Sequence, residues 1–317
     1  MTRIACVSFT CTDADSLAAF YRDAFGFAAL DVSYHSGTRF SRLVGIDGAE
    51  ARALRLGLGE QTIELLEFAK SGARYPSDCT SDDLRFQHIA IVASDMQAAY
   101  TRLSGHNAWT PISTPAPQQL PDSSGGVTAF KFRDPEGHPL ELLAFPSGKV
   151  PQKWRDASVN RGPCLGIDHS AIVVASTTRS VDFYEHILGF SIGGRSLNRG
   201  KEQERLDCVP DALVEVTALD PSPSGTPHLE LLCYLSPARQ QPRMAKSLSN
   251  DVAATRLVIE VEDFPTLAQK LDAIPVCFIS LGKVTLEDGR PAASICDPDG
   301  HALVLVGPHS DRPRSAA

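Results

Sequence analysis

One short block of sequence occurs four times along this chain. The two fuller copies are FTCTDADSLAAFYRDAFGF at 9–27 and VVASTTRSVDFYEHILGF at 173–190. The two shorter copies are IAIVASDMQAAYTRL at 89–103 and VIEVEDFPTLAQKL at 258–271. Each copy has the pattern of a strand that runs into an amphipathic helix. Because copies of one sequence block fold into copies of one structural unit, the repeat constrains the architecture before any single residue is considered.

A second repeated segment closes the units. FRDPEGHPLELLAFP at 132–146 matches CDPDGHALVLVGP at 296–308. We therefore divide the chain into four modules, namely module one (1–76), module two (84–147), module three (164–240) and module four (252–309). These predict a first domain at 1–147, a linker at 148–163 that is rich in Gly, Pro and charge, a second domain at 164–309, and a polar tail at 310–317.

Within each module the pattern predicts a strand, a helix and then three strands. Asp13 is a suitable N-cap for the first helix, and Gly26 is a stop signal after its last turn. The DPEG sequence at 134–137 is a turn signature that leads into a strand. The stretch 198–206 is assigned to the second and third strands of module three or their turn. Consecutive strands after each helix predict a mixed α+β sheet rather than a doubly wound parallel one.

Composition excludes several classes of partner. With 317 residues, 43% hydrophobic and 21% charged, the chain is long enough for two ordered domains. The net charge of −8, without a basic run, argues against nucleic acid and anionic membrane surfaces. No apolar stretch approaches the length that spans a bilayer. We expect a small-molecule substrate as the partner.

Cysteine usage predicts a cytoplasmic protein. The eight cysteines are scattered and form no C-x-x-C pair, which is typical of reduced thiols rather than of disulfides or a thiolate zinc site. The first residues lead almost directly into a strand and lack the basic start and apolar stretch of a secretory signal.

The repeated βαβββ pattern resembles the vicinal oxygen chelate superfamily, which includes glyoxalase I, methylmalonyl-CoA epimerase, extradiol dioxygenases and bleomycin resistance proteins. The resemblance rests on four motifs. In the two fuller copies FY stands near the end of the helix, and FGF or LGF follows that helix. The last strand contains IEL or LEL, and a DPEG or DPDG turn precedes the last strand in modules two and four. It implies two tandem glyoxalase-like domains with cupped sheets, each formed by two modules. It also implies a divalent metal in the cup, held by the first and last strands of each module.

The resemblance assigns a ligand position to each module's first and last strand. The first-strand position holds Cys6, His88, His169 and Arg256 in modules one to four. The last-strand position holds Glu64, Glu141, Glu230 and Val304 in the same order. Modules two and three therefore keep a full His and Glu pair, whereas module four has neither residue.

Two pairings of the modules are possible. If modules pair in sequence order, the first cup holds Cys6, Glu64, His88 and Glu141 and the second is a poor metal site. If module two pairs with three and one with four, a single cup collects His88, Glu141, His169 and Glu230. The split into two intact and two degenerate modules favours this crossed pairing.

The set of two imidazoles and two carboxylates suits one divalent ion of Zn, Ni, Co, Mn or Fe. The resemblance implies an isomerase or lyase of the glyoxalase I or epimerase type, acting on a small oxygen-bearing substrate through a metal-stabilised enediolate. Glu141 and Glu230 are the candidate catalytic residues, since one Glu can leave the metal and act as a base. An Fe(II) extradiol-type dioxygenase and a non-catalytic ligand-binding or resistance protein remain alternatives.

Other polar residues have weaker signals. His228 lies two residues before Glu230, on the same strand face, and could line the pocket. Asn198, Gln203 and Arg205 could bind an anionic substrate, and the Pro, Ser and Gly segment 117–130 could cover the pocket. His138 and His301 follow the DPEG and DPDG turns and are interpreted as turn or surface residues, and Tyr21 and Tyr184 as core residues. Four modules in one chain allow a monomer or a homodimer.

Overall fold

The structure is a computed structural model that describes residues 1–157, 162–221, 225, 227–237 and 247–309. Within these residues the chain forms two mixed sheets of nine strands each, with helices packed on them. The class is α+β, as the repeat pattern predicts. The predicted tail 310–317 lies outside the described residues.

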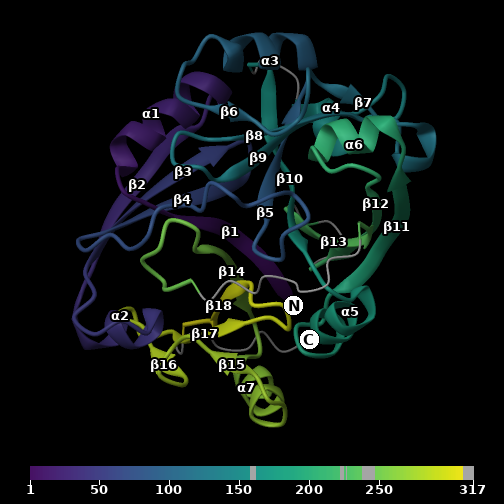
Figure 1. Cartoon of the computed structure of the whole chain (residues 1–317). Coiled ribbons are helices and arrows are strands. Elements are labelled where there is room, and N and C mark those ends of the chain that lie inside the picture. Colours follow the sequence, from purple (N-terminus) through teal and green to yellow (C-terminus); the bar gives the residue numbers. More distant parts are fainter. Residues whose placement is uncertain (158–161, 222–224, 226, 238–246, 310–317) are drawn as a thin grey trace.

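Sheet A is built from modules one and four, the purple and yellow strands of Figure 1. In spatial order it contains β15 (Cys277–Phe278), β17 (Pro291–Cys296), β18 (Ala302–Val306), β14 (Thr255–Val261), β1 (Thr2–Cys11), β4 (Gln61–Phe68), β3 (Ala51–Leu58) and β2 (Ala28–His35), with β16 (Val284–Thr285) beside β17.

Sheet B is built from modules three and two, the green and teal strands of Figure 1. In spatial order it contains β11 (Ser191–Arg199), β12 (Leu213–Asp220), β13 (His228–Ser236), β10 (Cys164–Val173), β5 (Gln87–Ala93), β9 (Pro139–Ala144), β8 (Thr128–Arg133) and β6 (Thr110–Pro111), with β7 (Gln118–Gln119) beside β8.

The modules therefore pair in the crossed order. The first strands of two modules meet antiparallel at the centre of each sheet, where β1 pairs with β14 and β10 pairs with β5. Each first strand also pairs in parallel with the last strand of its own module, as β10 does with β13. The predicted linker at 148–163 lies between modules one and two on one side and modules three and four on the other. Each sheet contains one module from each side of this linker.

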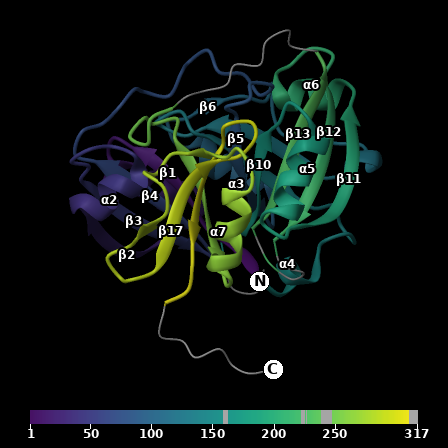
Figure 2. The same cartoon turned by 90° about the horizontal axis from the view of Figure 1, so that it is seen from below.

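The helices cover the two sheets, and Figure 2 shows α5 beside the sheet B strands and α7 beside the yellow strands of sheet A. They are α1 (Ala14–Phe25), α2 (Gly37–Val44), α3 (Met96–Ser104), α4 (Gln152–Ala157), α5 (Thr177–His186), α6 (Lys201–Asp207) and α7 (Phe264–Asp272), with a short 3₁₀ helix, η1, at Asp122–Ser124.

In α1, Asp13 accepts a hydrogen bond from the Ser16 N–H at 2.9 Å, and Gly26 ends the helix with a φ of 86°. Both predicted capping residues are confirmed. None of the helices in the described ranges is long and apolar enough to cross a membrane.

One local prediction was wrong. Residues 201–207 form the helix α6 rather than a strand or hairpin, because Gln203, Leu206 and Asp207 bury one helical face. The corresponding stretch of module one, 37–44, is also a helix, α2. The linker 148–163 contains α4, since Trp154 is 3% exposed and packs on Val92 and Leu165.

The repeated Asp-Pro turns join the two sheets. Tyr21 on α1 donates to Asp134 of the DPEG turn at 3.2 Å, and Tyr184 on α5 donates to Asp297 of the DPDG turn at 3.1 Å. The DPEG turn of module two, which belongs to sheet B, thus contacts a helix on sheet A. The DPDG turn of module four, which belongs to sheet A, contacts a helix on sheet B. Both tyrosines are core residues, as predicted, and each also ties one sheet to the other.

His138 and His301, interpreted from the sequence as turn or surface residues, lie at these turns but are buried. His138 is 0% exposed and His301 is 6% exposed. Nε2 of His138 lies 2.9 Å from the Thr10 carbonyl on β1, and Nε2 of His301 lies 2.8 Å from the Val173 carbonyl on β10. The surface assignment was wrong because the first strand of the preceding module covers each turn.

We expect Tyr21→Phe and Tyr184→Phe to destabilise the protein by similar amounts, about 1–3 kcal/mol each, because each removes one buried hydrogen bond to a carboxyl group. Urea unfolding measures the effect. Tyr34→Phe is the matched control, since Tyr34 is 79% exposed and should change the free energy of unfolding by less than about 0.5 kcal/mol. A Tyr184→Phe variant as stable as the control would contradict a joining role for the DPDG turn.

Candidate metal centre

The four predicted ligand residues lie on four neighbouring strands of sheet B. His88 is on β5, Glu141 on β9, His169 on β10 and Glu230 on β13, and these strands are adjacent in the order β13, β10, β5 and β9. The antiparallel register sets Ala171 opposite His88, and the parallel register sets Ala171 beside Glu230. The crossed pairing of modules two and three is what brings the residues to one cup.

Three of the four form a compact cluster. His88, Glu141 and His169 each offer a ligand atom, and these atoms all lie within 4.8 Å of one another. Nε2 of His88 lies 3.2 Å from Oε2 of Glu141. All three residues are buried, with exposures of 1%, 6% and 5%.

His88 is the residue that most needs a further partner. Among the described residues, Nδ1 of His88 has no hydrogen-bond partner, and Nε2 has only its contact with Oε2 of Glu141 at 3.2 Å. Burial lowers the pKa of His88 by more than the contact with Glu141 raises it, and this favours the neutral ring. Burial alone would raise the pKa of Glu141, but His88, Lys131 and His169 hold it below its ordinary value. A neutral imidazole and a carboxylate are the forms that bind a divalent metal.

Glu230 lies at the edge of this cluster. Its Oε2 is 3.5 Å from Nε2 of His169, and its Oε1 is 3.5 Å from Nε2 of His228. Its side chain is 23% exposed, so it is the most accessible of the four predicted ligands. Burial would raise the pKa of Glu230, but the charges of His169 and His228 lower it to about 2. The structure therefore places His228 beside the cluster, in contact with Glu230.

Asp168 supports the two histidines of β10 and β13. Its Oδ2 lies 3.2 Å from Nδ1 of His169 and 3.9 Å from Nδ1 of His228, and the indole of Trp154 donates to Oδ1 at 3.1 Å. Burial would lower the pKa of His169, but Glu230 and Asp168 raise it to about 9. Because the carboxylate of Asp168 lies at Nδ1, Nε2 is the nitrogen that faces a ligand. A carboxylate at the other ring nitrogen is the usual outer partner of a metal-bound histidine.

A buried ion pair that sequence reasoning missed closes the other side of the cup. Nζ of Lys131 lies 2.6 Å from Oδ1 of Asp207 and 3.9 Å from Oε2 of Glu141. Burial alone would lower the pKa of Lys131, but the two carboxylates raise it. Gln203 and Tyr234 donate to Asp207 at 2.7 and 2.8 Å. The sequence feature that could have indicated this ion pair is Lys131 itself. It lies between two phenylalanines in the strand AFKFR, so its side chain is on the opposite face from their rings.

A cavity of about 410 Å³ opens over these residues. Asn198 and Gln203 line it, whereas Arg205 lies on the exposed face of α6. Leu120, Ser124 and Val127 also line it, so part of the 117–130 segment borders the pocket as predicted. The cavity has the size and mixed lining of a small-molecule site.

The degenerate cup of sheet A has a different chemistry. Cys6 is buried, Ser8 donates to Glu64 at 2.7 Å, and Arg256 is buried and donates to the Ser249 carbonyl. Apolar residues of sheet A pack together near this cup. Phe68 follows Glu64 at the same spacing as Tyr234 follows Glu230, so a phenylalanine stands where the cup of sheet B has a tyrosine. Over the described ranges, the clusters of three candidate metal ligands all lie in sheet B.

Comparisons with known proteins agree with this architecture. The family model described as Glyoxalase/Bleomycin resistance protein/Dioxygenase superfamily matches residues 3–142 and again 166–305. Glyoxalase I from Zea mays has a TM-score of 0.63 and 18% identity, covering 97% of this chain and 92% of its own. A suspected dioxygenase from Bacillus subtilis has a TM-score of 0.57 and 13% identity, covering 97% and 86%. At these identities the likeness shows the fold alone, and no curated protein matches the sequence.

Proposed function

Because the chain belongs to the Glyoxalase/Bleomycin resistance protein/Dioxygenase superfamily, we propose that it is a metal-dependent isomerase or lyase of the glyoxalase I or epimerase type. Its substrate would be a small compound with neighbouring oxygen atoms. The proposal includes a cytoplasmic location and His88, Glu141 and His169 as the residues that hold the ion. The observation that carries it is Glu230, an accessible carboxylate held by His228 at the edge of the cluster.

A divalent ion held by this cluster would act as a Lewis acid on the substrate's oxygen atoms. Glu230 would take a proton from the carbon next to the carbonyl, because its side chain, at 23%, is more exposed than that of Glu141, the other carboxylate lining the cavity. His228 and Asp168 hold this part of the site in place. Lys131 stabilises negative charge that develops on substrate oxygen, and Asp207 fixes the ammonium group.

The test measures exchange of the proton next to the carbonyl in vicinal hydroxy ketones, by proton NMR in deuterated buffer. We expect metal-loaded protein to catalyse the exchange and Glu230→Gln to lower its rate by about 10²–10⁴-fold, the usual contribution of a general base. Glu64→Gln, the equivalent change in the degenerate cup, is the matched control and should keep the rate. Equal rates in wild type and Glu230→Gln would contradict the role of Glu230.

One observation favours a second candidate. The compact cluster of His88, Glu141 and His169 is a set of two histidines and one carboxylate, which is also the donor set of Fe(II) oxygenases. Uptake of oxygen by the iron-loaded protein with catechols or hydroquinones, in the absence of proton exchange, would favour an extradiol-type dioxygenase over the isomerase or lyase.

A further inference from the structure

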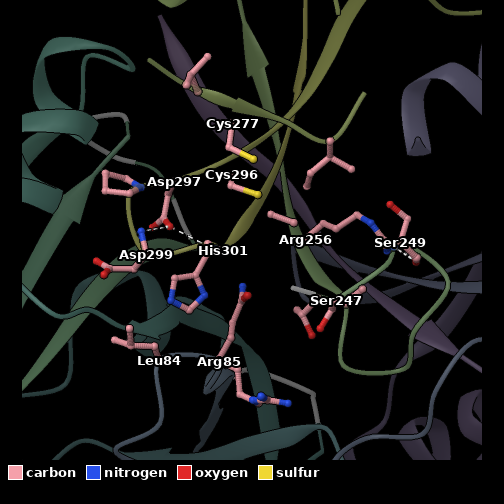
Figure 3. Close-up of a pocket in the computed structure, with 18 of the residues that line it drawn as sticks. Leu84, Arg85, Ser247, Ser249, Arg256, Cys277, Cys296, Asp297, Asp299 and His301 are labelled. Carbon is pink, nitrogen blue, oxygen red and sulfur yellow. Dashed lines mark hydrogen bonds between the residues drawn. The ribbon is translucent and has the colours of Figure 1, made fainter. Parts of the chain in front are cut away.

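Two cysteines face each other at the edge of sheet A. The register of β15 and β17 sets Cys277 directly opposite Cys296. Opposite residues of antiparallel strands have Cα atoms about 4.5–5.5 Å apart, within the range of about 4.4–6.8 Å that a disulfide spans. Both thiols are free in the structure. Figure 3 shows the two side chains one above the other, with both sulfur atoms turned to the same side.

The pair is open to small reagents. Cys277 is exposed and Cys296 is half-buried. Both line a cavity of about 680 Å³ that Arg179 and Phe183 of α5 also line. Five other cysteines, Cys6, Cys11, Cys79, Cys164 and Cys233, are buried, and the exposed Cys208 ends α6 on sheet B.

We propose that Cys277 and Cys296 are a site of reversible oxidation, at which a hydroperoxide forms an intramolecular disulfide. The thiolate of Cys277, the more exposed of the two, attacks one peroxide oxygen. The O–O bond breaks, a water leaves when hydrogen peroxide is the reagent, and Cys277 becomes a sulfenic acid. The sulfur of Cys296 then attacks the sulfur of Cys277, and the sulfenic oxygen leaves as a second water. The two thiols lose two electrons and two protons, and the peroxide is reduced to two waters.

The surroundings fit these roles. Burial and the neighbouring Cys277 raise the pKa of Cys296 to about 12, so Cys296 is mostly protonated and reacts slowly with peroxide itself. β15 is an edge strand of two residues, so it can adjust to the geometry of a disulfide with little loss of pairing. Next to Cys296, Asp297 and Asp299 contact Tyr184 and Arg179 of α5. The bond would therefore tie the edge strand to the turn that joins sheet A to α5.

The test uses the full chain with Cys208→Ser, which removes the other exposed thiol. Reduced protein is treated with a small molar excess of hydrogen peroxide, the remaining thiols are alkylated, and the unreduced digest is analysed by mass spectrometry. We expect a peptide pair joined through Cys277 and Cys296 that dithiothreitol separates. The oxidised protein should also unfold at a temperature a few degrees higher than the reduced protein, since the bond closes a loop.

Two variants and a second reagent make the outcome decisive. In Cys296→Ser, Cys277 should proceed to sulfinic acid, whereas in Cys277→Ser, Cys296 should stay reduced. Phenylarsine oxide, which joins two neighbouring thiols with loss of water, should bind the parent protein tightly and either serine variant at least about tenfold more weakly. Overoxidation of Cys277 at the same rate with and without Cys296, or equal arsenical binding by all three proteins, would overturn the proposal. Neither readout depends on the metal centre or on the proposed function.

Discussion

Replacing His88 and His169 together by alanine should leave the purified protein without bound divalent metal, whereas wild type should hold about one ion per chain. The two imidazoles supply two of the three groups in the compact cluster, and the remaining carboxylates alone make a poor site for Zn, Ni or Co. Elemental analysis of both proteins after the same metal loading measures the effect. Nickel, cobalt or zinc would favour isomerase or lyase chemistry, and iron would favour the dioxygenase.

The matched control is a double variant of exposed histidines, His186→Ala with His309→Ala, which should keep the metal. Glu141→Gln provides a milder change in the same cluster, and we expect it to weaken metal binding without loss of fold, as judged by circular dichroism. A stoichiometric ion retained by a folded His88→Ala, His169→Ala protein would contradict the assigned site.

Replacing His138 by alanine should destabilise the protein by about 3–5 kcal/mol, the usual cost of removing one partner of a buried charged pair. Nδ1 lies 2.8 Å from Oδ2 of Asp134, and Nε2 lies 2.9 and 3.0 Å from the carbonyls of Thr10 and Val252. Because all of these oxygen atoms are acceptors, both ring nitrogens must donate, and the ring is an imidazolium. One side chain therefore links a turn of sheet B to two segments of sheet A.

This effect should depend on pH. Burial would lower the pKa of His138, but Asp134 raises it above its ordinary value. A group with a raised pKa in the folded state stabilises fully below its unfolded value of about 6.5, and the contribution is lost as the pH rises through the folded value. Urea unfolding should therefore show a larger difference between wild type and His138→Gln near pH 6 than at alkaline pH. The exposed His186→Gln should show no such difference, and a pH-independent effect of His138→Gln would contradict the imidazolium.

The repeat made the fold and part of the site predictable. At the ligand positions that the resemblance implies, modules two and three have His88 and His169 where modules one and four have Cys6 and Arg256, and this contrast favoured the crossed pairing that the structure contains. The pairing was predictable because the four copies lie in one chain and differ at equivalent positions, whatever the propensity of any single residue.

The rest of the site was not predictable, because it depends on contacts between distant residues. Lys131 and Asp207 are 76 residues apart, and nothing local marks either as half of a buried ion pair. α6 was missed since its charged sequence shows a buried face only once sheet B surrounds it. His138 and His301 follow turns, which are usually exposed, and only the packing of another module makes them interior residues.

The crossed sheets also determine the order in which this protein can fold. Thr2 pairs with Val261, so the first strand of the chain has its central neighbour in the last module. Contacts of such sequence separation are slow to form, and they are unavailable while the ribosome is still making the middle of the chain. We therefore expect one edge of β1 to stay unpaired until module four has been made, whereas modules two and three, which are adjacent in sequence, can form sheet B first.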